Sequence, residues 1–556
     1  MTVLRDSVLA QRGDLAVASP LLMLHQVGEA LVPVLVGVVI DNAVRTGDLG
    51  QLVLWLLVLG LDFLMLSNCY RLGARRTWLA EARADQRLRR QVTERVLDAR
   101  GGAEAGRLPG ALVNIAVGDA KRVAALQLAL PFGLAGLAAL VVAAVALLRI
   151  SLPLGLLILL GTPPLLYLLR LLGKPLQRRS GPEQERAAQA AGVAADLVAG
   201  IRVVKGIGAE AAAVRRYTAT SREALAATLR AGRAQGWYQG AVLAANGLFL
   251  ALVALVGGRL AAAGSISVGE LVSAVGLAQF LLGPLGVFGR VVSALAQARP
   301  SAERIESVLS APPSVHGGDA APDTPARGEL RLRRLSRGPL TGLDLHVQPG
   351  ELLGIVSADP AAVTTLLDCL NREADPAWGS IELDGHPLVD LDPGLLRGVI
   401  LVAAHDAELF AGTVRENVTA AVGEEVDPGP ALRAAQADEV ATSLPGGLDA
   451  PVSEQGRSLS GGQRQRVALA RALATDTPVL VLHDPTTALD TVTEARVAEA
   501  LRELRRGRTT LVATTSPALL AACDRVVELD GGAVRAQGSH AELLDRDADY
   551  RTLVLG

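Results

Sequence analysis

The stretch RSLSGGQRQRVALARAL, residues 457–473, predicts a helix that begins at a Ser-Gly-Gly step. Its apolar and charged residues follow helical spacing, which is typical of an amphipathic helix. Ser460, Gly461 and Gly462 come directly before this helix, so their backbone N–H groups lie at its positive end. Such helix ends bind phosphate groups. The stretch therefore predicts a phosphate contact at residues 460–462.

The same stretch resembles a known motif. LSGGQ followed by RQRVALARAL is similar to the signature of ATP-binding-cassette (ABC) transporters. Further segments that resemble this family are GELLGIV, FAGTVREN (410–417), SEQG (453–456), DPTTALD, ELDGGAVRAQGSH (528–540), LVGVVIDNAV (35–44) and GIRVVKGIGAE (200–210). Together they make the chain similar to an exporter-type half-transporter, in which six membrane spans precede one nucleotide-binding domain.

The resemblance implies a dimer with two ATP molecules between the paired nucleotide-binding domains. Each ATP, with its Mg²⁺, would be held by the P-loop of one chain and the signature of the other. The signature residues that would face the partner's ATP are Leu459, Ser460, Gly461, Gly462 and Gln463. Asp490, which ends the segment Ala488-Leu489-Asp490, would lie in the D-loop at the dimer contact.

The domain organisation follows from hydropathy. Hydrophobic residues make up 50% of the 556 and concentrate in the first 300. Six apolar stretches have close to the ~20 residues that cross a membrane; they are 20–43, 52–70, 124–149, 151–173, 238–262 and 268–294. A Pro/Gly/Ala-rich linker occupies 311–327, and strands alternate with helices from Gly328 onward. We expect a multi-domain protein: an all-α six-helix transmembrane domain (1–310), then an α/β P-loop-type nucleotide-binding domain (328–556).

The two long loops, after the second and fourth stretches, are rich in arginine. Positive charge keeps such loops in the cytoplasm, so we expect a multi-pass inner-membrane protein with both termini and the nucleotide-binding domain on the cytoplasmic side. Helical spacing in these loops would carry their turns ~35–40 Å below the membrane. Turns near 106–116 and 200–210 are then expected to be coupling helices that touch a nucleotide-binding domain. Helical hairpins without such a contact are the alternative.

The P-loop position departs from the family pattern GxxxxGK[ST], whose glycines and lysine surround the phosphates. The segment here is SADPAAVTT (357–365). Ser357, Pro360 and Ala362 replace the glycines, Val363 replaces the lysine, and Asp359 adds a negative charge; Thr364 and Thr365 follow, with Thr364 at the residual magnesium-binding hydroxyl position. These changes predict ATP binding weaker by ~3–6 kcal/mol, which converts micromolar affinity to roughly millimolar.

Other ATP-binding positions also depart from the pattern. In VLVLHDPTTALD (479–490), the family's magnesium-orienting aspartate aligns with His483 and its general-base glutamate with Asp484. A neutral histidine does not replace a carboxylate around Mg²⁺, and aspartate is one methylene too short to place the water. His405 stands where the family has a magnesium-sensing glutamine, and Thr515 where it has the switch histidine. The sequence therefore predicts a degenerate Walker A and Walker B site with no competent catalytic residue and no metal ligand set.

There are three alternatives to a silenced ATP site. In the first, Val363 is a single tolerated substitution. In the second, His405 and His483 form a new metal site, and in the third, the intact signature is a relic in a decaying gene. The simultaneous loss at several positions argues against the first, and two histidines without a carboxylate pattern argue against the second. Retention of the signature and of Ala488-Leu489-Asp490 argues against decay.

Composition argues against two classes of protein, those that bind nucleic acid and those held together by disulfides. The net charge of −2 provides no general basic field for nucleic acid, and three distant cysteines argue against a disulfide framework. Within the apolar stretches, Asp62 and His25 either mark a substrate path or lie near the membrane interface.

We therefore expect a subunit of a heterodimeric ABC transporter that exports a small molecule, lipid or peptide. Its signature would serve ATP and Mg²⁺ held mainly by a second half-transporter with intact Walker A and B motifs, in contact with membrane lipid. This chain alone would be almost inactive. A siderophore importer subunit of the same shape and a regulatory pseudo-ATPase without transport are the alternatives.

Overall fold

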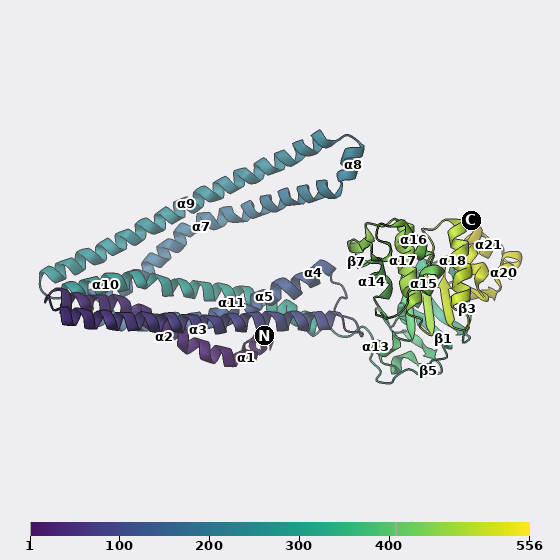
Figure 1. Cartoon of the computed structure of the whole chain (residues 1–556), viewed down its shortest axis with the longest axis horizontal. Helices are drawn as coiled ribbons and strands as arrows, with labels where there is room; N and C mark the ends of the chain where they lie inside the picture. The colour runs from purple at the N-terminus through teal and green to yellow at the C-terminus, as the bar shows by residue number, and fades with distance from the viewer. Residues whose placement is uncertain (1, 406–407, 424) are drawn as a thin grey trace. The chain divides into compact units, whose positions relative to one another are not determined.

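The computed structural model describes residues 2–405, 408–423 and 425–556 (Figure 1). By their contacts the residues form two units, one of residues 1–92 and 110–307 and one of residues 93–109 and 308–556. The first unit is helical, and the second combines sheets with helices. The expected fold class is confirmed in both parts.

Six helices of the first unit are long and apolar enough to cross a membrane. The helices of this part are α1 Thr2–Ala10, α2 Arg12–Val39 with its π-helical extension Ile40–Val44, α3 Leu49–Val96, α4 Pro109–Asn114, α5 Ala120–Ala124, α6 Leu126–Ile150, α7 Leu152–Ala199, α8 Ile201–Gly206, α9 Glu210–Ala262, α10 Val268–Phe280 and α11 Leu282–Leu309. α3, α7 and α9 run past the apolar stretches without a break, as the helical spacing of the loops predicts. A buried cluster from α6, α7, α9 and α10 holds the outer ends of the bundle together.

The α7–α9 pair forms a helical hairpin that diverges from the rest of the bundle in Figure 1, with the short helix α8 at its tip. The tip carries several large apolar side chains that are exposed in the single chain. Val198 is 69% exposed, Val203 66% and Ile207 74%. These residues lie well beyond the apolar span that ends near 173, so lipid does not cover them.

The second unit is built on a six-stranded sheet of order β12-β11-β3-β10-β9-β6. Its strands are β3 Leu352–Ser357, β6 Ile400–Ala403, β9 Val479–His483, β10 Thr509–Ala513, β11 Arg525–Asp530 and β12 Ala533–Gly538. β6, β9, β10, β3 and β11 are parallel, and β12 pairs antiparallel with β11. An antiparallel sheet β2-β1-β4-β5 consists of β1 Leu330–Arg337, β2 Leu340–Val347, β4 Trp378–Leu383 and β5 His386–Pro387, and β7 Gly412–Thr413 pairs with β8 Pro451–Val452.

The parallel sheet is covered on both faces, which explains its unbroken apolar runs. Along β9, Leu480 and Leu482 face one core, while Val479 and Val481 face the other, because successive side chains of a strand alternate. The helices of this unit are α12 Pro360–Leu370, α13 Pro393–Leu396, α14 Val414–Thr419, α15 Gly429–Ala434, α16 Ala437–Ser443, α17 Gly461–Ala474, α18 Thr491–Leu504, α19 Pro517–Ala522, α20 His540–Arg546 and α21 Ala548–Leu555.

The turn after α3 packs within the second unit, against the linker. The Arg100 carbonyl accepts hydrogen bonds from the Ser314 N–H (3.0 Å) and the Val315 N–H (3.3 Å). Arg95 donates to the Ala311 carbonyl at 2.8 Å. Gly102 approaches so closely that a Cβ there would lie 2.1 Å from the Pro312 carbonyl oxygen. The turn after α3 is therefore tied to the linker that leads into the second unit.

Candidate functional site

The candidate site lies at the carboxyl edge of the parallel sheet. β3 and β9 both flank β10, and the register pairs Ala513 of β10 with Ile355 of β3 and with His483 of β9. Carboxyl ends of parallel strands meet at one edge, which is where ligands bind in open α/β sheets. The fold therefore brings together the segments that follow β3, β6, β9 and β10. These segments begin with residues 358, 404, 484 and 514.

The segment at the P-loop position is not a loop around a phosphate but the start of a helix. α12 begins at Pro360, and Asp359 is its N-cap, with its Oδ1 accepting a hydrogen bond from the Ala361 N–H at 2.9 Å. Asp359 in turn donates its own N–H to Ser357 Oγ at 3.1 Å. A carboxylate is thus already bound at a helix end that in P-loop proteins receives phosphate.

The side chains of this first helical turn are also engaged within the chain. Ala362 (1% exposed) and Val363 (7% exposed) belong to the buried core beneath the sheet. The Thr364 hydroxyl donates to the Pro360 carbonyl at 3.0 Å, and the Thr365 hydroxyl donates to the Ala361 carbonyl at 2.7 Å. The position of the family's lysine therefore points into the apolar core, and the residual magnesium-binding hydroxyl is bonded back to its own helix.

His483 and His405 lie side by side at the sheet edge, with ring centroids 5.7 Å apart. His483 Nε2 is 4.0 Å from Asp484 Oδ2. Burial lowers the pKa of His483, and the neighbouring His405 adds to this, while Asp484 acts in the opposite direction. Asp484 itself has a left-handed backbone (φ 45°) and donates its N–H to the Ala513 carbonyl at 2.9 Å. His483 is therefore favoured in its neutral form, which supplies no negative charge for Mg²⁺.

Thr515, after β10, is exposed and lies at the same sheet edge. Among the residues that the structure describes, no group of three or more His, Cys, Asp or Glu side chains is arranged to hold a metal ion. The residues that the sequence places around the ATP site are thus gathered at one edge of the sheet.

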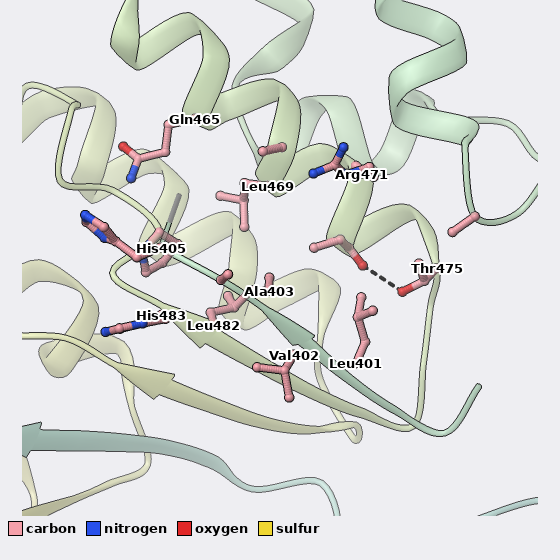
Figure 2. Close-up of a pocket in the computed structure, with 15 residues that line it drawn as sticks. Leu401, Val402, Ala403, His405, Gln465, Leu469, Arg471, Thr475, Leu482 and His483 are labelled. Atoms are coloured by element: carbon pink, nitrogen blue, oxygen red, sulfur yellow. Dashed lines mark hydrogen bonds between the residues drawn. The ribbon is translucent and has the colours of Figure 1, made fainter. Parts of the chain in front are cut away.

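A cavity of about 340 Å³ opens beside the two histidines, between α17 and strands β6 and β9. Figure 2 shows both imidazoles at one end of it, with Arg471 and Thr475 toward the other. Arg471 donates to the Glu408 carbonyl at 3.0 Å and stacks over the Phe410 ring at 5.6 Å. Burial lowers the pKa of this guanidinium. The walls are mostly Ala, Leu and Val, and none of the described residues that line the cavity is a carboxylate.

The signature has an ordered, outward-facing start. Ser460 is the N-cap of α17, and its Oγ accepts from the Gln463 N–H at 3.3 Å while Gln463 Oε1 accepts from the Ser460 N–H at 2.9 Å. This capping box fixes the helix end. Leu459 is buried beneath it, whereas Ser460 and Gly461 are exposed. The positive end of α17 is therefore accessible from outside the chain.

Gln465 joins the signature helix to the segment after β9. Its Nε2 donates to the Asp484 carbonyl (2.9 Å) and to Thr487 Oγ1 (3.0 Å), and its Oε1 accepts from the Ala488 N–H (2.8 Å). Asp490 then caps α18, and its hydrogen bonds with Thr493 and Val492 lower the pKa of its carboxyl. Sequence reasoning missed Gln465; a buried glutamine on the apolar face of an amphipathic helix is the signal that points to it.

Gly462 permits α17 to lie close to the segment that follows β9. A Cβ at Gly462 would lie 2.7 Å from the Ala488 carbonyl oxygen, whereas a Cβ at Gly461 would meet Ala488 Cβ at an ordinary 3.8 Å. We expect Gly462→Ala to separate α17 from residues 485–490 at a cost of about 1 kcal/mol or more. Hydrogen–deuterium exchange of the full chain should then be about fivefold faster or more in that segment. Gly461→Ala is the matched control, and equal exchange in both variants would contradict the packing role.

Comparison with known proteins agrees with this geometry. Residues 16–285 match the family model of the ABC transporter transmembrane region, and residues 340–487 match that of the ABC transporter. The chain is 33% identical over 403 residues to an ATP-dependent lipid A-core flippase of Ralstonia nicotianae, covering 70% of this chain and 68% of that protein. It is 38% identical over 299 residues to the same kind of flippase from Alkalilimnicola ehrlichii, covering 52% and 51%.

Another relative is a multidrug efflux ATP-binding/permease protein of Mycobacterium tuberculosis, 33% identical over 381 residues that cover 67% of this chain and 32% of that protein. The two matched domains, their order and the six long apolar helices all agree with a membrane domain of six spans followed by an ABC domain. The chain is a multi-pass membrane protein that belongs to the ABC exporters, as a half-transporter with one transmembrane domain and one nucleotide-binding domain.

Proposed function

We propose that this chain is one subunit of a heterodimeric ABC exporter with a single competent ATP site. That site combines the signature of this chain with the P-loop, magnesium-binding aspartate and catalytic glutamate of a partner half-transporter. ATP and Mg²⁺ are held mainly by the partner, and the site at Ser357–Thr365 of this chain does not hydrolyse ATP.

The observation that carries the proposal is the start of α12 at Pro360 with the Asp359 carboxylate as its cap. An ATP phosphate at this place would have to displace a carboxylate and would still find no lysine. The neutral His483 and the short Asp484 add no ligand or base that restores hydrolysis. A homodimer of this chain would contain two such sites, so a catalytically intact partner accounts better for an ABC exporter.

The signature supports the other half of the proposal. Ser460 and Gly461 are exposed at the end of α17, a helix of 14 residues, and the capping box keeps this end formed. Donors fixed in advance around developing negative charge stabilise the transition state of phosphoryl transfer. The signature of this chain therefore fits the γ-phosphate of ATP bound elsewhere, while its own P-loop segment does not fit ATP.

The helical part also favours assembly with another subunit. The tip around α8 exposes Val203 and Ile207 outside the apolar spans, and monomeric soluble surfaces seldom leave such contiguous apolar groups uncovered. We propose that this tip, with Gly206, and the turn near Gly110 are coupling elements that pass the opening and closing of the nucleotide-binding dimer to the spans.

Photolabelling tests the assignment of nucleotide to the partner. In the complex purified through a tag on this chain, azido-ATP with Mg²⁺ should label the partner subunit strongly and this chain weakly. Thr364→Ala should leave the pattern unchanged, because the Thr364 hydroxyl is bonded to its own helix. Strong magnesium-dependent labelling of this chain that Thr364→Ala abolishes would refute the proposal.

A further inference from the structure

A groove of about 540 Å³ opens between α2, α6 and α10 in the helical unit. Its walls are largely aliphatic and include Leu31, Val34 and Val38 of α2 and Val141 and Val145 of α6. On each helix these residues are three, four or seven positions apart, so they lie on one face. We call this hollow the outer groove.

α2 and α10 pack closely along one side of the outer groove. Gly37 of α2 leaves no room for a side chain, because a Cβ there would overlap Ser273 Oγ of α10. Ser273 and Glu270 of α10 both line the groove. The hollow is therefore bounded by three helices that belong to the same unit.

Helix length places the outer groove in one leaflet of the membrane. α6 has 25 residues, Leu126–Ile150, and Arg149 lies in its last turn. This is ~37 Å of helix against a hydrocarbon core of ~30 Å, so Arg149 reaches the interface. Val141 lies eight residues earlier, ~12 Å deeper. α6 ends here in a short connection rather than a long loop, so with the nucleotide-binding domain in the cytoplasm this is the outer leaflet.

The aliphatic walls favour a hydrocarbon chain as the occupant. Val141 is 56% exposed and Val145 52%, although both lie within a membrane span. An apolar hollow does not hold water, and an empty one would forfeit dispersion contacts along its lining. A lipid chain from the surrounding leaflet supplies these contacts.

Two carboxylates lie at the mouth of the outer groove, Asp41 after α2 and Glu270 at the start of α10. Asp41 Oδ1 accepts from the Gly269 N–H at 3.1 Å, and its Oδ2 accepts from the Ser267 hydroxyl. Glu270 Oε2 accepts from the Ser267 N–H at 2.7 Å. An ionised carboxylate has about four lone-pair positions. Both groups are therefore held in place and can still accept from another donor.

Arg149 supplies the positive charge at the same mouth. It is exposed, and within the described part of the chain it has no hydrogen bond or ion pair. A guanidinium binds phosphate through two parallel, charge-assisted hydrogen bonds. At the membrane interface, lipid headgroups present phosphate to such a cation.

We propose that the outer groove binds a phospholipid with an ethanolamine headgroup, which stays with the protein and is not exported. Its acyl chain lies along α2 and α6, its phosphate contacts Arg149, and its ammonium donates to Asp41 and Glu270. Ethanolamine fits because its ammonium has three N–H donors. The choline headgroup has none, and phosphatidylglycerol places no positive charge opposite the two carboxylates.

Native mass spectrometry tests the site. The complex purified through a tag on this chain is titrated in detergent with phosphatidylethanolamine, phosphatidylglycerol or phosphatidylcholine of the same acyl chains, and bound lipids are counted. Phosphatidylethanolamine should bind most tightly. Arg149→Gln should weaken it by about tenfold or more, as expected for one lost charge-assisted contact. Arg259→Gln is the matched control, because Arg259 lies in the last turn of α9 but not in the groove.

Two further variants test the headgroup and the chain separately. Glu270→Gln keeps the capping box with Ser267, because glutamine also serves at that position. It should reduce the preference for phosphatidylethanolamine over phosphatidylglycerol by about tenfold and should not weaken phosphatidylglycerol. Val145→Trp fills the groove and should weaken all three lipids.

Three outcomes would overturn the proposal. An equal effect of Arg149→Gln and Arg259→Gln would mean that lipids contact the protein without a defined site. Release of the partner subunit by Val145→Trp with an unchanged lipid count would make the groove a subunit contact. Loss of the bound lipid during ATP turnover would make it exported cargo. Lipid binding needs no ATP hydrolysis, so the heterodimer proposal stands or falls separately.

Discussion

Ser460→Arg in this chain should reduce ATP hydrolysis and transport by the assembled exporter by about 100-fold or more. The arginine would occupy the space in front of α17 where the proposed γ-phosphate of the partner's ATP sits. Removing one preorganised donor from a transition state typically costs two to three powers of ten in rate, that is about 10²–10³. Steady-state phosphate release by the purified complex measures the effect, and export by cells or vesicles provides the second readout.

The controls separate loss of the ATP contact from loss of the helix cap. Ser460→Thr keeps the hydroxyl that accepts from the Gln463 N–H, so it should retain activity. Thr364→Ala, in the P-loop segment of the same chain, should also leave hydrolysis unchanged. If Ser460→Arg assembles normally and hydrolyses ATP at the unmodified rate, the composite-site proposal is wrong.

Rebuilding the P-loop of this chain should increase its affinity for MgATP by about two to four powers of ten. The variant combines Ser357→Gly, Asp359→Asn, Pro360→Gly, Ala362→Gly and Val363→Lys. It removes the capping carboxylate and returns a charge-assisted lysine contact, which together amount to ~3–6 kcal/mol. Fluorescence titration with TNP-ATP on the full-length chain measures the change.

A variant with only one of these substitutions helps to identify what weakens MgATP binding. Val363→Lys alone should give little gain, because position 363 faces the core and Asp359 still caps α12. Micromolar MgATP binding by the unmodified chain, or no gain in the fully rebuilt variant, would contradict a site silenced by these substitutions.

The sequence predicts the architecture well because its signals are long and redundant. Six apolar stretches and the helical spacing that follows them predict α3, α7 and α9 as continuous helices. The run Val479–Leu482 predicts a strand buried on both faces. The Ser-Gly-Gly step predicts the beginning of α17 at Gly461. Each of these depends on local pattern, which periodicity reads directly.

The local geometry of the degenerate site is less accessible from the sequence. Asp359 reads as a charge that would repel phosphate, but the Asp-Pro pair is also a helix N-cap followed by a favoured first residue. Which role dominates depends on where α12 begins. The interaction between Arg100 and the linker at Ser314 joins residues over 200 positions apart, and the outer groove beside Arg149 depends on how three helices pack. Such contacts depend on tertiary structure rather than on local pattern.

Asp359 has one further consequence, which concerns competition. Because the carboxylate is part of the chain, it competes with phosphate at the end of α12 as a tethered group whose local concentration is fixed by the backbone. The carboxylate cannot diffuse away. A rise or fall in cellular ATP therefore changes the concentration of the competing phosphate but not that of the carboxylate. ATP would therefore occupy the end of α12 only to the extent that its concentration overcomes this fixed competitor, and in the proposed heterodimer that occupancy would add no second hydrolysis event to each closure of the nucleotide-binding dimer.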